Sequence, residues 1–211
     1  MKKILIVDDH AVVRTGLQLI LESTGDLMVA GECGSGYEVL ILLEKEQYDL
    51  IILDIHIPGT DTIELLKILR KHYRAIPVVI FTMNTDDAFM VKLFQIGAAA
   101  YINKTLQPDK LIEILRKVLL QKRFITEDQA IKIANLSIDS TESPTGLESL
   151  TTREYQVFKL IASGKAYDNI ADELGLSKNT LANHRMSILK KLGLKNNADL
   201  TRFAIRYEVI Q

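Results

Sequence analysis

The chain has 211 residues, which is more than one ordinary domain needs and enough for two. Hydrophobic residues make up 47% and charged residues 25% of the sequence, so a collagen-like, low-complexity or wholly disordered chain is excluded. The formal net charge of −1 argues against a nucleic-acid partner, but a sum over the whole chain can conceal two halves of opposite charge.

The sequence indicates neither covalent cross-links nor a membrane segment. Cys33 is the only cysteine, which excludes an intramolecular disulfide and a structural zinc site built on thiolates. The apolar run at residues 4–7 ends in two aspartates and is too short for the core of a signal peptide. No stretch approaches the roughly 18 apolar residues that a spanning helix needs. We therefore expect a cytoplasmic protein with no membrane partner.

The first part of the chain alternates short apolar runs with segments of helical periodicity. The apolar runs, which predict strands, are residues 4–7, 28–30, 50–53, 78–81 and 98–102. The segments between and after them, which predict helices, are residues 11–23, 36–46, 61–73, 86–95 and 108–121. A buried helix can also contain four apolar residues in a row, but five such runs at this spacing favour strands covered on both faces. The pattern predicts an α/β fold with a five-stranded, doubly wound parallel sheet, and we expect the strand order 2-1-3-4-5.

The pattern changes after Arg123. Residues 135–149 are rich in Ser, Thr, Pro and Gly, a composition typical of a linker. Beyond them the periodicity is helical only. Thr151 and Glu154 fit a capping box, and Leu150 and Tyr155 fit its hydrophobic staple. Further helices are expected at residues 168–174, from after 177 to 192, and 197–207. We therefore predict a first domain at 1–122, a linker at 123–148 and a small all-α domain at 149–211.

The division into domains also divides the charge. Residues 149–211 hold ten Lys and Arg against six Asp and Glu, for a net charge of +4. Residues 1–148 hold 16 basic and 21 acidic residues, for a net charge of −5. The near-zero total therefore conceals an acidic N-terminal part and a basic C-terminal part.

Polar residues follow the predicted strands at their carboxyl ends, where open α/β sheets carry their sites. They are Asp8 and Asp9 after strand 1, Asp54 after strand 3, Thr82 at the end of strand 4, and Lys104 after strand 5. Each alone is most often a turn or capping residue, but their coincidence at one edge favours a site. Clustered carboxylates need a cation, and hard oxygen ligands suit Mg²⁺. The carboxylate left over can then act as a nucleophile toward a phosphoryl group, whose charge a lysine would help to neutralise.

These residues resemble the receiver-domain signature of bacterial response regulators across residues 1–122. The matching motifs are Asp8-Asp9, Leu53-Asp54, the loop 54–59, Thr82 and Lys104. The resemblance implies a flavodoxin-like receiver in which Asp54 accepts a phosphoryl group from a sensor histidine kinase. It implies that Asp9, Asp54 and the backbone carbonyl of His56 ligate Mg²⁺, while Asp8 holds the waters of the metal. It also implies that Thr82 and Tyr101 form the switch pair and that Lys104 binds the phosphoryl group.

Two residues depart from the receiver pattern. Met83 stands where the family usually has a small residue, so we expect it to shield the phosphorylation site in part. Thr62 stands where many relatives have glycine, in the loop before the third helix. His56, Met83 and Asn84 occupy positions from which a side chain can tune dephosphorylation. Neither departure removes a catalytic group, so they bear on rates and loop conformation.

Residues 170–181 predict a helix, a tight turn at Gly175 and a second helix. Apolar residues form one face of each helix: Ile170, Ala171 and Leu174 on the first, and Leu181, Ile188 and Leu192 on the second. This arrangement is typical of a helix-turn-helix, whose second helix enters the DNA major groove. An ordinary helical hairpin in an interaction domain is the alternative, and the net charge of +4 favours DNA.

Rotating the second helix by 100° per residue separates its polar face from its apolar face. The candidate DNA-binding residues are Ser177, Lys178, Asn179, Thr180, Asn183, Met186 and Lys190. Asparagine can read adenine, methionine can contact a thymine methyl group, and lysine suits a phosphate. Arg185 lies nearer the apolar flank, so contact with DNA and packing within the domain both remain open.

The second half is similar to the LuxR-type helix-turn-helix over residues 147–207. The matching stretches are Leu150-Thr151-Thr152-Arg153-Glu154, Ile170-Ala171, Leu174-Gly175-Leu176-Ser177, Thr180–His184 and Lys191-Leu192-Gly193-Leu194. With the receiver, the chain resembles a NarL/FixJ-type response regulator, which implies a transcription factor activated by phosphorylation and no enzyme beyond its own phosphoryl chemistry. In that family the helix at 197–207 pairs DNA-bound domains, which implies a homodimer on paired half-sites of double-stranded DNA.

Two other functions remain as alternatives. A regulator of the same architecture can work without phosphorylation, through ligand or protein binding alone. An aspartyl-nucleophile phosphatase of the haloacid-dehalogenase type is disfavoured because it would need Asp-x-Asp after the first strand, where this chain has adjacent Asp8 and Asp9.

Overall fold

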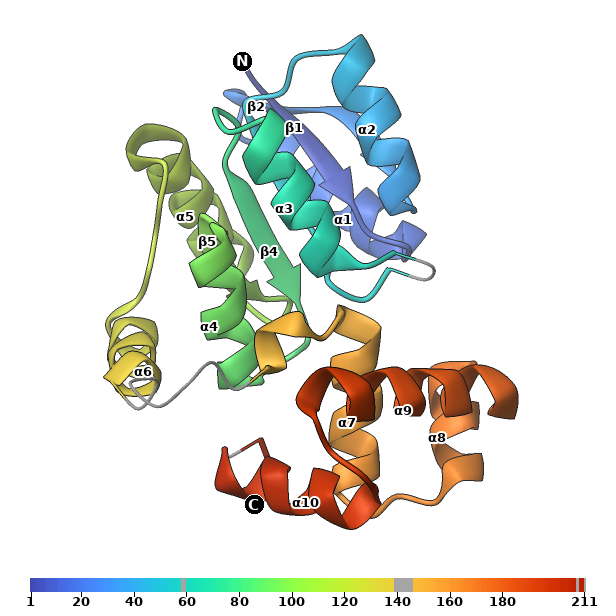
Figure 1. Cartoon of the computed structure of the whole chain (residues 1–211). Helices are drawn as coiled ribbons and strands as arrows, with labels where there is room; N and C mark the ends of the chain where they lie inside the picture. The colour runs from blue at the N-terminus through green and yellow to red at the C-terminus, as the bar shows by residue number, and fades with distance from the viewer. Residues whose placement is uncertain (58–59, 139–145, 208, 211) are drawn as a thin grey trace. The chain divides into compact units, whose positions relative to one another are not determined.

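The computed structural model describes residues 1–57, 60–138, 146–207 and 209–210, and Figure 1 shows their secondary structure. Contacts divide the chain into two compact units, Met1–Ser137 and Ile138–Gln211. Each unit has its own core, and each is described by itself.

The first unit is built on a five-stranded parallel sheet. The strands are β1 (Lys2–Val7), β2 (Leu27–Cys33), β3 (Leu50–Leu53), β4 (Val78–Thr82) and β5 (Ala100–Asn103). Their order is β2-β1-β3-β4-β5, which confirms the predicted topology. In the register of the sheet Val7 lies beside Leu53, and Thr82 lies beside Asn103. The carboxyl ends of four strands therefore meet at one edge.

Helices cover both faces of this sheet (Figure 1). They are α1 (Ala11–Glu22), α2 (Gly36–Lys45), α3 (Thr62–His72), α4 (Asp87–Ile96) and α5 (Pro108–Gln121). Leu17 and Leu21 of α1 join Leu111, Leu115 and Val118 of α5 in a core cluster against one face of the strands. The inner residues of β1, β3, β4 and β5 are buried, as their continuous apolar runs predicted for a sheet covered on both faces. The inner residues of the edge strand β2 are only partly buried or exposed.

Capping residues set where the helices of the first unit begin. Asp61 accepts hydrogen bonds from the backbone N–H groups of Ile63 and Glu64 at the start of α3, and Asp86 accepts one from Phe89 at the start of α4. These caps satisfy N–H groups that have no partner within the helix. They fix the two loops that lead away from the carboxyl ends of β3 and β4.

The expected linker at 123–148 contains a helix that the sequence pattern did not indicate, α6 (Glu127–Ile138). The side chain of Gln129 in α6 donates a hydrogen bond to the carbonyl of Tyr101 at 2.8 Å. Lys132 forms an ion pair with Asp87 of α4 at 2.8 Å. The first part of α6 is therefore bound to the first unit, while the domain limits given above remain a prediction.

The second unit is helical. Its elements are a short 3₁₀ turn η2 (Leu147–Ser149) and the helices α7 (Thr152–Ala162), α8 (Tyr167–Leu174), α9 (Lys178–Leu192) and α10 (Asn197–Arg206). The predicted capping box at Thr151 and Glu154 is confirmed, with both of its hydrogen bonds present. Phe158, Ile188 and Leu200 are fully buried in the core. Within the described residues, no helix of either unit is long and apolar enough to span a membrane.

Candidate functional site

Three polar side chains are almost completely buried at the carboxyl edge of the sheet. Asp8 is 1% exposed, Asp54 is 3% exposed and Thr82 is fully buried. Each stands where its strand ends, so the parallel register brings them together. Burying a carboxylate without a partner costs several kcal/mol, so this edge must supply compensating charge.

Lys104 supplies that charge. Its Nζ lies 2.6 Å from Asp8 Oδ2 and 2.9 Å from Asp54 Oδ2. A hydrogen bond from its backbone N–H to the Thr82 carbonyl, 2.9 Å long, sets its position after β5. Burial lowers the pKa of Lys104, but its hydrogen bonds to Asp54 and Asp8 outweigh that effect, so the pKa is raised overall. The ammonium group therefore stays charged between the two carboxylates.

The second oxygen of each buried carboxylate is held by the backbone. Asp54 Oδ1 accepts a hydrogen bond from the N–H of Ile55 at 2.7 Å, and Asp8 Oδ1 accepts one from the N–H of His10 at 2.9 Å. Thr62, the departure from the receiver pattern, is fully buried and donates its hydroxyl to the carbonyl of Ile55 at 3.0 Å. Thr62 therefore anchors the residue next to Asp54, a role that glycine has no side chain to perform.

The acidic cluster has the donors that a magnesium site needs. Side-chain ligand atoms of Asp8, Asp9, His10 and Asp54 all lie within 4.8 Å of one another. Three carboxylates around one ammonium leave excess negative charge, and carboxylate oxygens are the donors that Mg²⁺ prefers. The backbone carbonyl of His56 is not part of this side-chain cluster, so its role stays a prediction.

His10 belongs to the site more closely than the sequence indicated. Its side chain is 65% exposed, as expected for a surface residue, but its Nδ1 lies 2.7 Å from Asp9 Oδ1. Arg14, one turn further along α1, donates to the carbonyl of Asp8 at 2.8 Å. The only sequence signals for these contacts were the short spacings from the Asp8-Asp9 pair.

Thr82 and Tyr101 are linked through one backbone segment. The N–H of Asn84 donates to Thr82 Oγ1 at 3.2 Å, and the Tyr101 hydroxyl donates to the carbonyl of Asn84 at 3.0 Å. Burial raises the pKa of Tyr101, so its phenol stays neutral. Any displacement of Thr82 would therefore reach Tyr101 through Asn84. Met83, which lies between Thr82 and Asn84 in the sequence, is 62% exposed. Its expected shielding of the phosphorylation site stays a prediction.

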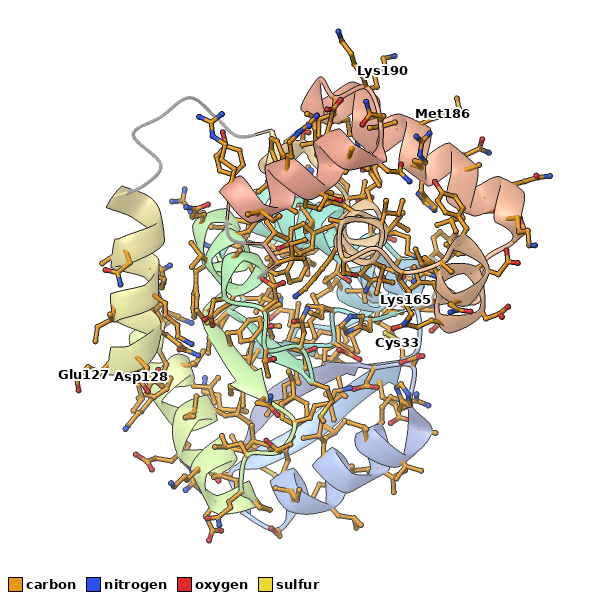
Figure 2. The ribbon with its side chains drawn as sticks, turned by 90° about the horizontal axis from the view of Figure 1, so that it is seen from below. Cys33, Glu127, Asp128, Lys165, Met186 and Lys190 are labelled. Atoms are coloured by element: carbon orange, nitrogen blue, oxygen red, sulfur yellow. The ribbon has the colours of Figure 1, made fainter. Side chains whose placement is uncertain are left out.

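The seven candidate DNA-binding residues lie at the start of α9 and along its exposed surface. All seven are exposed: Ser177, Lys178, Asn179, Thr180, Asn183, Met186 and Lys190. Figure 2 shows Met186 and Lys190 projecting outward from the same helix. The opposite face carries Leu181 and Ile188, both fully buried, so α9 has one anchored side and one free side.

Three of the candidate residues at the start of α9 already have partners, since the hydroxyls of Ser177 and Thr180 lie 2.8 Å apart. Ser177 caps the helix by accepting from the N–H of Thr180 at 3.1 Å. Lys178 pairs with Asp168 of α8 at 2.8 Å, and both side chains are exposed. Surface pairs of this kind contribute little to stability, so Lys178 remains available to a phosphate.

Side chains that the sequence left open or did not single out position α9 within the second unit. Arg185 donates from Nε to Asn197 Oδ1 at 2.6 Å and is half-buried, which supports its packing role. Glu154, 5% exposed, accepts from Lys191 at 2.6 Å and from the Ser187 hydroxyl. Burial raises the pKa of Glu154, but these hydrogen bonds and that of the capping box lower it overall to about 2. Sequence indicated the cap alone, because Lys191 lies 37 residues away.

Two family models match the chain. The response regulator receiver domain matches residues 4–116, and the LuxR family of bacterial regulatory proteins matches residues 148–204. Together these matches cover the strand-end cluster and the second unit from η2 to most of α10.

Known proteins are similar over nearly the whole chain. The response regulator UvrY of Escherichia coli K12 is 29% identical over 209 residues, which cover 98% of this chain and 95% of that protein. The response regulator GacA of Pseudomonas aeruginosa is 30% identical over 210 residues, covering 100% and 98%. Among solved structures, RcsB of Salmonella enterica bound to the promoter rprA matches with a TM-score of 0.60 at 25% identity, covering 96% of this chain and 97% of that one.

Proposed function

This chain belongs to the response regulators that join a receiver domain to a LuxR-type DNA-binding domain, and from that premise we propose that phosphorylation of Asp54 by a sensor histidine kinase controls its binding to DNA. One observation carries the proposal. Asp54 is buried against Lys104 and beside a second carboxylate, at a strand end where a phosphoryl group would meet an ammonium group.

The residues of the acidic cluster have complementary roles in the proposed transfer. An oxygen of Asp54 attacks the phosphorus of a phosphohistidine, the new O–P bond forms as the N–P bond breaks, and the electron pair stays on the imidazole nitrogen. Lys104 stays protonated and binds the phosphoryl oxygens. A magnesium ion bound by Asp9, Asp54 and the carbonyl of His56, with Asp8 holding its waters, would neutralise further phosphoryl charge. The receiver then catalyses only its own phosphorylation and dephosphorylation.

The proposed signal leaves the site through Thr82. A phosphoryl group on Asp54 offers the proton of the Thr82 hydroxyl a charged acceptor, whereas the present bond from the Asn84 N–H uses only the hydroxyl oxygen, so the hydroxyl is drawn toward the phosphoryl group. Movement of this segment removes the carbonyl that now holds the Tyr101 hydroxyl, so the buried ring is free to reorient. Because Gln129 is bonded to the carbonyl of Tyr101, we expect the change to loosen α6, the helix that precedes the second unit.

The second unit is proposed to read double-stranded DNA with α9 in the major groove. Its exposed face carries Asn183 and Met186 for base edges and Lys190 for a phosphate, while Ser177 and Thr180 stand at the helix start. The relative RcsB has been solved on a promoter, which supports a DNA-binding role. We propose that α10 pairs two copies of this chain on two half-sites, and that the protein acts in the cytoplasm, where a bacterial chromosome is accessible.

The test is a phosphorylation assay coupled to DNA binding. Incubation with acetyl phosphate and Mg²⁺ should add one phosphoryl group to the wild-type mass, none to Asp54→Asn, and one to the matched control Asp109→Asn, since Asp109 is an exposed residue of α5. Beryllofluoride, a phosphoryl mimic, should raise the affinity for DNA fragments selected from the genome. An unmodified wild-type mass would overturn the receiver role. DNA affinity that ignores beryllofluoride would favour the phosphorylation-independent regulator instead.

A further inference from the structure

A second polar site lies at the opposite end of the same sheet. A cavity of about 230 Å³ opens where β4 and β5 begin, between the last turns of α3, α4 and α5. Four cationic side chains line it, Arg70, Arg74, Lys122 and Arg123, and the rest of its lining is alanine, proline and glycine. Since β4 runs from this cavity to Thr82, the two sites are separated by about 13 Å, the length of four strand steps. The cavity is therefore distinct from the Asp54 site.

The arginines of this cavity are held by carbonyl groups. Arg70 donates from Nη1 to the carbonyl of Arg74 at 3.2 Å. Arg123 donates from Nη2 to the carbonyl of Phe94 at 3.1 Å, and its guanidinium lies over the Phe94 ring at 5.7 Å. Across the described residues, none of the four cations forms an ion pair with a carboxylate. Each of these two arginines uses one N–H in its carbonyl bond, so further N–H donors and the positive charge remain for a ligand.

The negative ends of nearby helix dipoles compensate only part of the positive charge of these four side chains. The carboxyl ends of α3, α4 and α5 each present roughly half a negative charge, about −1.5 in total. Against the four cations this leaves an excess of about +2.5, which is close to the charge of a phosphate monoester or a pyrophosphate group. The helix ends alone therefore leave most of the positive charge of the cavity uncompensated.

Two helix ends shape the backbone of the cavity. Lys122 has a φ of 65°, the only positive φ at a non-glycine residue in the part of the chain that the structure describes. This is the left-handed C-cap of α5, in which the N–H of Lys122 bonds to the carbonyl of Val118. The cap turns the chain at the point where Lys122 and Arg123 line the cavity. Gly97 has a φ of 122°, and a Cβ there would lie 2.7 Å from Arg70 Nε. Gly97 thus lets the Arg70 side chain pass across the turn before β5.

We propose that this cationic cavity binds a small, multiply charged phosphate compound, such as a phosphate monoester or a pyrophosphate group. Arginine guanidinium groups bind phosphate oxygens in pairs of parallel hydrogen bonds, and two of the four cations are already oriented by carbonyls. A cavity of about 230 Å³ accommodates one or two phosphate groups. A DNA backbone would instead need an extended row of cations, and the exposed face of α9 is the candidate for that.

The experiment follows NMR signals of the full chain during titration with pyrophosphate, in the absence of Mg²⁺ so that the Asp54 site does not compete. The amides of Gly97, Ala98 and Ala99 should shift in a saturable manner. Arg70→Gln and Arg123→Gln should each weaken binding about tenfold or more, because each removes charge-assisted hydrogen bonds. Arg116→Gln, a matched control on α5 whose guanidinium is paired with Asp26, should leave the affinity unchanged.

Three outcomes would overturn the proposal. One is the absence of saturable shifts at these amides. Another is an equal loss of affinity in Arg116→Gln, because that would indicate attraction to overall charge. The third is a loss of DNA affinity in Arg70→Gln without any response to pyrophosphate, which would make the cavity a DNA-backbone contact. Lys122→Gly removes a positive charge from the cavity at a position where glycine adopts the same left-handed backbone. It should therefore weaken pyrophosphate binding while leaving the fold intact.

Discussion

Glu154 is the side chain whose contribution to the second unit can be worked out most directly. The pKa of Glu154 is lowered from 4.5 to about 2, in spite of burial, by hydrogen bonds from Lys191, Ser187 and the backbone of Thr151. This lowering of the pKa corresponds to roughly 3 kcal/mol of stability at neutral pH, an upper value. Since the side chain is only 6% exposed, solvent screening reduces it little. Glu154→Gln keeps the cap but removes the charge, so we expect a loss of about 2 to 3 kcal/mol.

The pH dependence gives this prediction a definite sign. A carboxylate with a lowered pKa in the folded state stabilises the fold above pH 4.5, and this stability is lost as the pH falls from 4.5 toward 2. Wild-type protein should lose it in that window, whereas Glu154→Gln should not.

Urea unfolding followed by NMR measures the effect in the full chain. Signals of Leu181 and Leu200 report on the second unit, and signals of Ile52 on the first unit serve as the internal control. Equal urea midpoints for Leu181 in wild type and Glu154→Gln at pH 7 would refute the reasoning. So would a wild-type pH profile that the Gln variant reproduces, because the titrating group would then be another residue.

The remaining predictions concern the receiver site, its connection to α6, and the DNA-facing helix. Lys104→Met should destabilise the first unit by about 3 kcal/mol or more and reduce the phosphoryl adduct, because two buried carboxylates lose their shared cation; urea unfolding and intact mass measure both. Thr62→Val should cost about 1 to 2 kcal/mol in urea unfolding, because the carbonyl of Ile55 loses its buried donor. Gln129→Ala should speed hydrogen exchange of α6 without changing that of α5. Asn183→Ala should weaken binding to the selected DNA by about 1 to 3 kcal/mol and relax its specificity, and Lys190→Ala should weaken all sequences alike and lower the salt slope by about one.

Each of these expectations has an outcome that contradicts it. Full stability of Lys104→Met at pH 7 would mean that the carboxylates are compensated in another way. If Thr62→Val were as stable as wild type, the hydrogen bond to the Ile55 carbonyl would contribute nothing to stability. Unchanged α6 exchange in Gln129→Ala would remove the proposed link from Tyr101. Equal DNA effects of the Asn183 and Lys190 variants on specific and random sequences would contradict base reading by Asn183.

The sequence predicted the frame of the first unit because that frame depends on local patterns. Continuous apolar runs and intervening helical periodicity are properties of neighbouring residues, and they indicated five strands and the edge where Asp8, Asp54 and Thr82 lie. The strand order was an expectation from the doubly wound fold class, which the structure confirms. The capping box at Thr151 was readable for the same reason, since its partner Glu154 is three residues away. The helix α6 was missed because its last residues overlap the segment 135–149, whose composition is that of a linker, so the whole stretch after Arg123 was assigned to the linker.

What only the tertiary structure decided is which side chains meet across the chain. Lys104 contacts Asp54 over 50 residues, Lys191 contacts Glu154 over 37, and Arg70 and Arg123 line one cavity from two separate helix ends. The sequence by itself determined where charged groups stand along each element and how the net charge divides into −5 and +4. Folding decided which of those charges neutralise one another and which remain for a ligand. The physical reason is that local periodicity depends on adjacent residues, while charge compensation depends on distances that only the packing of the sheet and helices sets.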